Sequence, residues 1–400
     1  MENKKMSDDP IVIVGMARTP MGGFQGDLAD VKAPVLGSIA IEEAMKRAGV
    51  EGSDIDEVIM GCVLPAGLGQ APARQASFGA GIPDSVGCTT VNKMCGSGMR
   101  AAMYAHDAIV AGSADIMVAG GFESMTNAPY VLPKVREGLR LGHAQMKDHM
   151  FLDGLEDAYE EGRLMGSFAE ETAGLYQFTR EAQDAYAIES LARAKRATEG
   201  GNFADEIAPV TIKTRKGEIV IDKDEQPLKG NPEKIPTLRP AFAKDGTVTA
   251  ANASSISDGG AALILMKQSE AEKRGLKPIA KFLAHSTHAR KPSEFTLAPI
   301  DAIRKVMDKV EWTKDDVDLF EINEAFAVVA MAAMKDLGLD HDKVNVHGGA
   351  CALGHPVGAS GARIVVTLLN ALRQYGKTRG VAALCIGGGE ATAMAVELVN

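Results

Sequence analysis

The 400-residue sequence has no apolar run long enough to cross a membrane or to form the core of a signal peptide. Its first apolar run is the five-residue IVIVG, and this follows the polar start MENKKMSDDP. A membrane-spanning helix needs about 20 apolar residues, and a signal peptide also needs an extended apolar segment. We therefore expect no secretion and no membrane partner, and we predict a cytoplasmic protein.

Cysteine and long basic blocks are also scarce. The five cysteines are an odd number without close pairing, which is typical of reduced cytosolic thiols rather than of a disulfide framework. The formal net charge is −10, and no long basic block offsets it, so we expect no nucleic-acid partner. The 43 glycines and a hydrophobic content of 46% indicate instead a globular protein with a large core and many tight backbone turns.

A pattern of helix, turn and strand occurs twice. The segments IEEAMKRAGVEGSDIDEVIMG from Ile41 and IDAIRKVMDKVEWTKDDVDLFEI from Ile300 each predict an amphipathic helix, a polar turn and an apolar strand. Further on, VNKMCGSG from Val91 and VNVHGGACALGHPVGASG from Val344 each lead through an apolar helix to another strand. Two related halves predict two similar α/β layers that pack together around mostly buried sheets.

Residues 123–249 interrupt this pattern with scattered proline, glycine and charge. A long insertion of this kind is more often functional than idle. It contains one clear amphipathic helix, TREAQDAYAIESLARAKRATEGG, with Thr179 as N-cap and a glycine stop. The segment ANASSISDGGAALILM then returns the chain to a strand of the first half. We therefore predict a lid-like subdomain rather than a linker.

Two cysteines and a histidine lie in separate glycine-dense segments. Because glycine lets the backbone turn tightly and approach a ligand closely, we expect these segments to form the walls of one reaction pocket. Cys95, between a strand and an apolar helix, is predicted to be a nucleophile whose thiolate is favoured by the helix dipole and by free amides. His355 precedes Pro356 and suits a general base that takes the proton from a thiol. Cys385 ends an apolar strand, and the free amides after it could bind a carbonyl oxygen.

Asn323 closes a strand and opens an apolar helix in the segment LFEINEAFAVVAMAAM. It is suited to hold a water molecule or to polarise a carbonyl, but asparagine is equally an ordinary helix cap, and both interpretations stay open. His347, Cys351 and His355 fall four residues apart, a spacing that could suggest a metal site. A loop broken by glycine and proline does not present them on one helical face, so we expect no metal.

Four segments, VNKMCGSG, NEAF, GGACALGHPVGASG and CIGGG, occur in this order across nearly the whole chain, and through them the sequence resembles the thiolase family. The resemblance implies a five-layered αβαβα fold, built from two similar halves with a loop domain inserted in the first. It implies an N-terminal half at 1–122 plus 250–274, a loop domain for tetramerisation and coenzyme A binding at 123–249, and a C-terminal half at 275–400.

The resemblance also implies the activity of an acetyl-CoA C-acetyltransferase: reversible Claisen condensation of two acetyl-CoA into acetoacetyl-CoA and CoA, through an acyl-cysteine. Coenzyme A and acyl-CoA would be substrates, with no permanently bound cofactor. Cys95 would take up the acyl group, His355 would activate it, and Cys385 would move the α-proton of the second acyl group. One oxyanion site would come from His355 and a water held by Asn323, and the other from the backbone amides of Cys95 and Gly387.

Coenzyme A would lie, by the same resemblance, against the returning segment TAANASS and the loop domain. Ser254 would hydrogen-bond the pantetheine arm, and Ala253, Ala325 and Phe326 would line its tunnel. The thiolase resemblance further implies a homo-oligomer, and we expect a tetramer built as a dimer of dimers.

The segment GRLMGSFAEETA resembles the acyl pocket of the family. Met165 in this segment argues for a short acyl chain, whereas Leu164 stands where some biosynthetic members carry histidine. A broader or long-chain 3-ketoacyl-CoA thiolase of fatty-acid β-oxidation is the alternative. Two more distant alternatives are a decarboxylating ketoacyl synthase, against which Cys385 argues, and a catalytically silent relative, against which the complete set of four catalytic residues argues.

Overall fold

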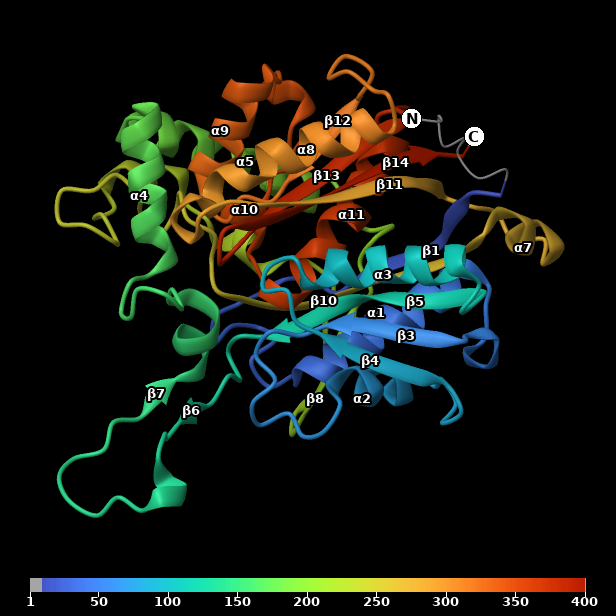
Figure 1. Cartoon of the computed structure of the whole chain (residues 1–400), viewed down its shortest axis with the longest axis horizontal. Helices are drawn as coiled ribbons and strands as arrows, with labels where there is room; N and C mark the ends of the chain where they lie inside the picture. The colour runs from blue at the N-terminus through green and yellow to red at the C-terminus, as the bar shows by residue number, and fades with distance from the viewer. Residues whose placement is uncertain (1–8, 400) are drawn as a thin grey trace.

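A computed structural model of the protein describes residues 9–399 (Figure 1). Residues 1–8, which carry most of the polar start, and residue 400 lie outside the described part. The centre of the molecule is one large mixed sheet with the strand order β12-β13-β14-β11-β1-β10-β5-β3-β4, and β2 pairs with β10. Its strands are β1 (Ile11–Arg18), β2 (Gly22–Gly23), β3 (Glu57–Gly61), β4 (Gly87–Val91), β5 (Ile116–Ser124), β10 (Ser257–Lys267), β11 (Ala280–Ala289), β12 (Leu319–Ile322), β13 (Arg379–Ile386) and β14 (Glu390–Leu398).

Helices cover both faces of this sheet and fill the space that it encloses. They are α1 (Ala33–Ala48), α2 (Pro72–Gly79), α3 (Ser97–Ala111), α4 (Met165–Tyr176), α5 (Arg180–Glu199), α6 (Glu225–Lys229), α7 (Gln268–Lys273), α8 (Ala298–Lys309), α9 (Ala327–Leu337), α10 (Ala350–Leu353) and α11 (Val357–Gln374). In Figure 1, α3 and α11 lie between the strands of the first half and those of the second. Helix α1 packs on the outer side of β1, β5 and β10, and α8 packs on the outer side of β11, β13 and β14. The predicted order of five layers, αβαβα, is therefore confirmed.

The predicted repeat is present as two similar arrangements of strands. In the first half β3 runs parallel to β4 and β5, and β10 is antiparallel to β5. In the second half β12 runs parallel to β13, and β14 is antiparallel to β13. The match is incomplete at one place, because Val344 forms a single bridge with Phe320 where the first half has the strand β4.

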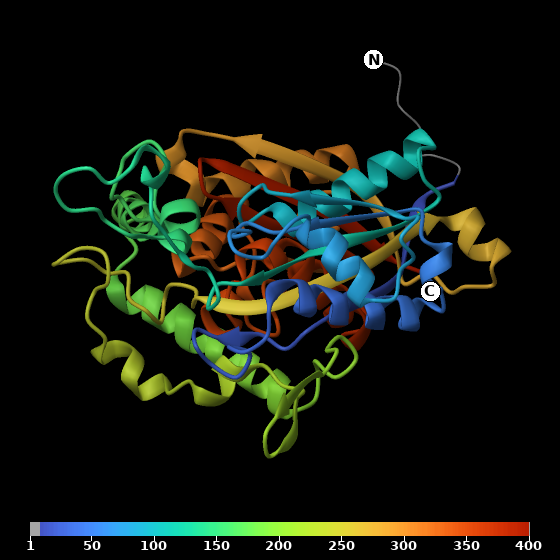
Figure 2. The ribbon, with the colours of Figure 1, turned by 90° about the horizontal axis from the view of Figure 1, so that it is seen from below.

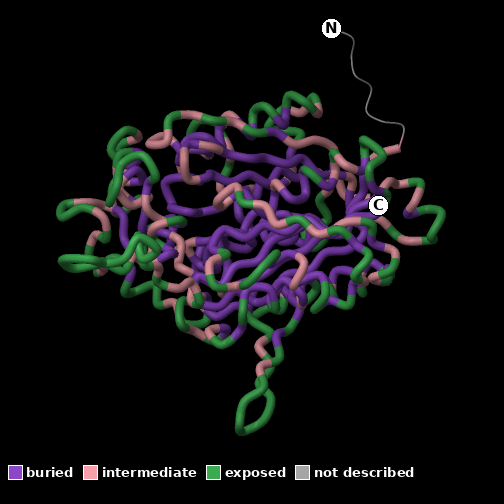
Figure 3. Tube along the Cα trace, turned by 60° about the horizontal axis from the view of Figure 1, so that its bottom comes forward, coloured by how far each residue is buried: buried purple, intermediate pink, exposed green. Residues whose placement is uncertain are grey.

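The two halves are joined through their backbones as well as through side chains. Strands β1 and β11 pair antiparallel over a short stretch, Val12 with Lys281 and Ile13 with Ala280. This pairing makes one sheet of the two, and the sheet wraps around α3 and α11. Figure 3 shows the consequence, since buried chain fills the centre of the molecule and exposed chain is confined to the periphery.

Glycine allows α3 and α11 to cross closely. A Cβ atom on Gly98 would lie 2.8 Å from the backbone nitrogen of Ala362, and one on Gly361 would lie 2.3 Å from that of Met99. Real Cβ atoms do not approach so closely, so any larger residue would push the helices apart. The crossing lies near the N-terminal ends of both helices, and it therefore brings Cys95, before α3, and His355, before α11, into the same region.

The chain between β5 and β10 extends along one flank of the sheets (Figure 2). It contains the strand pairs β6 (Tyr130–Val131) with β7 (Lys147–Asp148) and β8 (Val210–Thr214) with β9 (Gly217–Ile221), besides α4, α5 and α6. The hydroxyl of Thr179 accepts a hydrogen bond from the amide of Ala182, so the predicted N-cap of α5 is confirmed. Strand β10 then pairs with β1 and β5, as the returning segment predicted.

A buried ion pair network ties this intervening chain to the first strand. Arg18, at the end of β1, donates from Nε to Glu206 at 2.5 Å and from both terminal nitrogens to Asp224 at 2.7 and 2.8 Å. All three side chains are fully buried.

Within residues 9–399 there is no helix that combines the length and the apolar character needed to span a membrane.

Candidate active site

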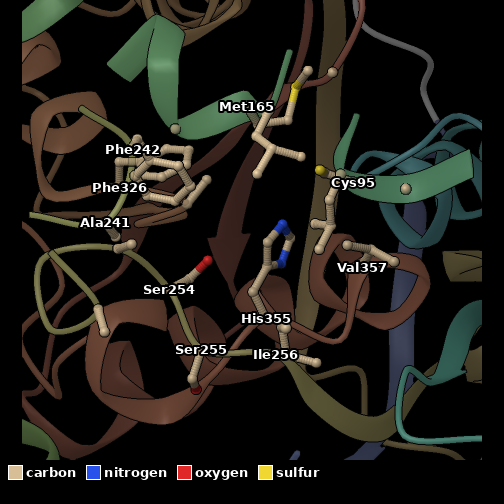
Figure 4. Close-up of a pocket in the computed structure, with 18 of the residues that line it drawn as sticks. Cys95, Met165, Ala241, Phe242, Ser254, Ser255, Ile256, Phe326, His355 and Val357 are labelled. Carbon is tan, nitrogen blue, oxygen red and sulfur yellow. The ribbon is translucent and has the colours of Figure 1, made fainter. Parts of the chain in front are cut away.

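One cavity of about 440 Å³ collects most of the predicted site residues (Figure 4). Its wall is predominantly apolar, as is usual for small-molecule sites. Cys95, His355 and Gly387 line it together with Leu164, Met165, Ala253, Ser254, Ala325 and Phe326. Asn323 and Cys385 are buried and are not among the residues that line the cavity.

Cys95 sits on a sharp turn between β4 and α3, as the sequence predicted. Met94 adopts a left-handed φ of 48°, an uncommon backbone conformation for a residue other than glycine. The next residue after Cys95, Gly96, is the N-cap of α3, and a Cβ atom there would lie 2.4 Å from Ile386. The turn therefore needs glycine, and it presents the Cys95 sulfur to the cavity, where Figure 4 shows it facing the His355 imidazole.

The expectation that the helix dipole and free amides favour the thiolate of Cys95 does not hold. Burial raises the pKa of this thiol to about 11, although the backbone amides of Gly387 and of Cys95 itself lower it. The negative charge of Glu123 raises the pKa further. Desolvation outweighs the helix dipole and the amides, so the group at rest is a thiol that must lose its proton during the reaction.

His355 is held in one orientation and one protonation state. Its Nδ1 lies 2.5 Å from the hydroxyl of Ser360, and that hydroxyl donates to the carbonyl oxygen of Pro356 at 2.9 Å. The hydroxyl must therefore accept a hydrogen bond from Nδ1–H, which leaves Nε2 of the neutral ring as a free lone pair. Burial first, and then the charge of Arg363, lower the pKa of His355 to about 3, so the ring is neutral near pH 7. Such a ring can accept a proton from a neighbouring group and pass it on at once.

Asn323 lies between β12 and α9 and is held from behind by Arg363 of α11. The guanidinium donates to Oδ1 of Asn323 at 3.3 Å and to the carboxylate of Glu321 at 3.0 Å. Because Oδ1 is the accepting atom, the amide nitrogen Nδ2 points elsewhere, and among residues 9–399 it has no hydrogen-bond partner. The buried Nε2 of His355 likewise has no partner in this part of the chain. Buried polar atoms are nearly always paired, so these two atoms are candidate partners for a water or a substrate oxygen.

Cys385 ends β13, as predicted, and is completely buried. Burial, with repulsion from Cys95 second, raises the pKa of this thiol well above its usual value. Gly387 follows, and its amide faces the Cys95 sulfur, as the lowering of the pKa of that thiol shows. Gly388 and Gly389 both have left-handed φ angles, 92° and 95°, which glycine adopts without strain. The two sulfurs and the Gly387 amide therefore belong to one cluster.

The predicted coenzyme A residues form the opposite side of the cavity. Ala253 and Phe326 form a backbone bridge, and the amide of Ser254 donates to the carbonyl of Ala325 at 2.9 Å. These contacts tie the returning segment after the insertion to the NEAF segment of the second half. Phe326 packs edge-on against Phe242 at 6.0 Å between ring centroids. The result is an apolar passage that leads to Cys95.

Two supporting residues were not predicted. Arg363, which holds Asn323, is a lone cation inside the apolar stretch GARIVVTLLNAL, and this isolation was a signal that could have revealed it. Glu123, at the end of β5, is completely buried and accepts backbone N–H groups from Val63, Leu64 and Gly358 at 2.9, 3.0 and 2.9 Å. Burial raises the pKa of Glu123 to about 7, although these hydrogen bonds lower it. The carboxylate thus fixes the loop after β3 to the start of α11.

The sequence analysis also missed most of the aromatic side chains that line the cavity. Besides the predicted Phe326, these are Phe24, Phe151, Phe242 and Phe295.

The two halves of this fold correspond to the two domains of one enzyme family. Residues 11–269 match the family model of the thiolase N-terminal domain, and residues 276–398 match that of the thiolase C-terminal domain. The chain therefore belongs to the thiolase family.

Individual relatives agree over their whole length. The chain is 50% identical to an acetyl-CoA acetyltransferase of Syntrophomonas wolfei, with 97% of this chain and 98% of the relative covered. It is 50% identical to acetyl-CoA acetyltransferase 2 of Arabidopsis thaliana, with 97% of each covered. The crystal structure of the Bacillus anthracis acetyl-CoA acetyltransferase superposes with a TM-score of 0.95 at 42% identity, covering 98% of this chain and 99% of that one.

Proposed function

We propose that the protein is an acetyl-CoA C-acetyltransferase, which condenses two acetyl-CoA into acetoacetyl-CoA and CoA and catalyses thiolysis in reverse. The observation that carries the proposal is that the Cys95 thiol and the neutral His355 imidazole line one apolar cavity. The Cys385 thiol and the amide nitrogen of Asn323, which is unpaired among residues 9–399, are buried close to lining residues. The Syntrophomonas and Arabidopsis relatives carry this name at 50% identity over nearly their full length. The chemistry needs coenzyme A thioesters as substrates, and it draws on sulfur, imidazole and amide groups of the chain itself.

The first half-reaction transfers an acetyl group to Cys95. Nε2 of His355 takes the thiol proton as the sulfur attacks the thioester carbonyl. The tetrahedral intermediate carries its negative charge on oxygen, and the amides of Cys95 and Gly387 are the donors that would bind it. When the intermediate collapses, the CoA sulfur leaves and takes the proton from His355. The products are acetyl-Cys95 and free CoA.

The second half-reaction forms the carbon–carbon bond. The thiol proton of Cys385 first passes to Nε2 of His355, and the resulting Cys385 thiolate removes an α-proton from a second acetyl-CoA. The N–H of the protonated His355 and a water bound to Asn323 stabilise the enolate oxygen. The carbanion attacks the acetyl-Cys95 carbonyl, the Cys95 sulfur leaves, and acetoacetyl-CoA is formed. The leaving Cys95 sulfur takes the proton of His355, and Cys385 keeps the α-proton, which restores the starting state of two thiols and a neutral imidazole. The raised pKa of Cys385 supports this role, because a thiolate in such surroundings is a strong base.

The side chains of the cavity and the names of the relatives support short substrates. Leu164, Met165 and Phe295 line the same cavity as Cys95. The names of the Syntrophomonas, Arabidopsis and Bacillus relatives all refer to acetyl transfer, and none refers to long acyl chains. The broader or long-chain thiolase has no support among these relatives, and it serves as the second candidate only in the test that follows.

The test is CoA-dependent cleavage of acetoacetyl-CoA beside a long-chain 3-ketoacyl-CoA, with Cys95→Ala as the control. Cleavage of acetoacetyl-CoA alone, lost in the control, is the expected result. A preference for the long chain would replace the proposal with the second candidate. Absence of cleavage with either substrate would favour a synthase or a silent relative.

We also propose that residues 123–249 act as a loop domain that holds coenzyme A and joins subunits. The arm around β6 and β7 extends away from the body of the molecule in Figure 1. It exposes several large apolar side chains, namely Tyr130, Leu132, Val135, Leu139, Leu141 and Met146. Apolar groups on an extended arm suit contact with another copy of the chain. A tetrameric mass in solution is the expected result, and a monomer at micromolar concentration would contradict it.

A further inference from the structure

Three side chains that the acyl-transfer mechanism does not use meet at the far end of α3. They are His106 and Asp107 on that helix and His285 on β11. Oδ1 of Asp107 lies 3.0 Å from Nδ1 of His106 and 2.8 Å from Nε2 of His285. The three atoms all lie within 4.8 Å of one another. Two imidazole nitrogens and one carboxylate oxygen therefore converge from two elements that are far apart in the sequence.

The rings are held in place and remain accessible. Phe282 lies 4.6 Å from the His106 ring and 5.8 Å from the His285 ring, between centroids. The two histidine side chains are 17% and 16% exposed, whereas Asp107 is 53% exposed. Packing thus restricts the imidazoles while the carboxylate side stays open to solvent. An ion could enter from that side without any unfolding.

The side-chain types of the cluster also suit a cation. Neutral imidazole and ionised carboxylate are the forms that bind zinc.

We propose that His106, Asp107 and His285 form a binding site for a divalent transition-metal ion of the zinc type, with water as the fourth ligand. Ligand atoms about 2.1 Å from a tetrahedral ion lie roughly 3.4 Å from one another. The two contacts of 2.8 and 3.0 Å would lengthen by a few tenths of an ångström, and the histidine nitrogens would give up the protons that they now share with Asp107. The set of two histidines and one carboxylate favours zinc, copper or nickel over magnesium and calcium, which prefer oxygen ligands.

The position of the site defines its effect. Helix α3 begins directly after Cys95, and His106 lies about 13 Å further along the helix at 1.5 Å per residue. A bound ion would fasten the C-terminal part of α3 to β11, and so connect the first half of the fold with the second. It would raise thermal stability and would take no part in acyl transfer.

The test is a titration of the untagged full-length chain with Zn²⁺ by calorimetry, repeated with Co²⁺ by absorption spectroscopy and followed by thermal unfolding. The variants are His285→Gln and Asp107→Asn. The matched control is His288→Gln, because His288 lies on the same strand and pairs with a different carboxylate, that of Asp301. Unchanged thiolysis of acetoacetyl-CoA without metal verifies that each variant is folded.

We expect one Zn²⁺ per chain, a higher unfolding temperature with Zn²⁺, and Co²⁺ bands without sulfur charge transfer. His285→Gln and Asp107→Asn should each weaken binding at least about tenfold, since their ligand is lost, and His288→Gln should bind as the wild type does. Equal binding by all variants would overturn the proposal, as would a sulfur charge-transfer band, which would place the ion on a cysteine. Absence of binding to the wild-type chain would also overturn it and leave a hydrogen-bonded cluster only.

Discussion

Replacement of Asn323 by alanine tests the proposed oxyanion site most sharply. The amide oxygen of Asn323 is occupied by Arg363, and its nitrogen Nδ2 is buried without a partner among residues 9–399. The variant removes the donor that would hold the water beside Nε2 of His355. Loss of one such donor commonly lowers the rate about 10²–10³-fold, or about 2.7–4 kcal/mol of transition-state stabilisation.

The same change has a separate and smaller cost in stability. Arg363 loses one acceptor, and a hydrogen bond to a charged group contributes about 1.5–3 kcal/mol. Arg363 keeps its ion pair with Glu321 at 3.0 Å, so the guanidinium is not left unpaired. We therefore expect a folded Asn323→Ala variant with reduced stability and a large, specific loss of activity.

The two half-reactions distinguish this role from a general disturbance of the site. The enolate forms only in the condensation step, so acetylation of Cys95 should be nearly unchanged while condensation falls about 10²–10³-fold. Acetylation is measured by intact-protein mass spectrometry after mixing with acetyl-CoA, and condensation by the appearance of acetoacetyl-CoA. Equal losses in both steps, or a loss in neither, would refute the role assigned to Asn323.

Three further predictions concern the buried ion pairs of Arg18, the pH dependence of stability and the selection of acyl-chain length. Arg18→Met leaves Glu206 and Asp224 buried without their cation, and should lower the free energy of unfolding in urea by about 3–5 kcal/mol; a change below about 1 kcal/mol would contradict this. His355 has a pKa of about 3 when folded and about 6.5 when unfolded, so the unfolded chain binds more protons between these values. The free energy of unfolding should therefore fall as the pH is lowered from about 6.5 toward 3, and its slope against pH should be smaller in His355→Asn. Identical slopes in the two proteins would exclude His355 as a cause of this pH dependence. Met165→Ala enlarges the acyl pocket and should raise kcat/KM for 3-ketohexanoyl-CoA relative to acetoacetyl-CoA, whereas an unchanged ratio would remove Met165 from chain-length selection.

The sequence predicted those parts of the site that depend on local chain geometry. Glycine next to Cys95, His355 and Cys385 marked the turns that follow β4 and β13 and precede α11, and each turn lies where it was expected. The strand–helix junction at Asn323 was predicted for the same reason. These features follow from short segments whose backbone conformation is fixed by their own residues.

Contacts between distant segments could not be predicted in this way. Glu123 accepts hydrogen bonds from segments that are 60 and 235 residues away, and Arg363 reaches Asn323 across 40 residues. The pairing of β1 with β11, which makes one sheet of two, has no local signal either. The sequence also failed to predict that burial outweighs the helix dipole at Cys95, because desolvation depends on everything that packs around the sulfur.

The division of labour between Cys95 and Cys385 is the central claim, and acetylation of the Cys385→Ser variant tests it most directly. The variant is mixed with acetyl-CoA, digested, and analysed by mass spectrometry, while the solution is assayed for acetoacetyl-CoA. The account predicts that the acetyl group is found on Cys95 and that no acetoacetyl-CoA forms, because the acyl acceptor is intact and the base is lost. Full condensation by this variant, or an acetyl group on another residue, would contradict the account.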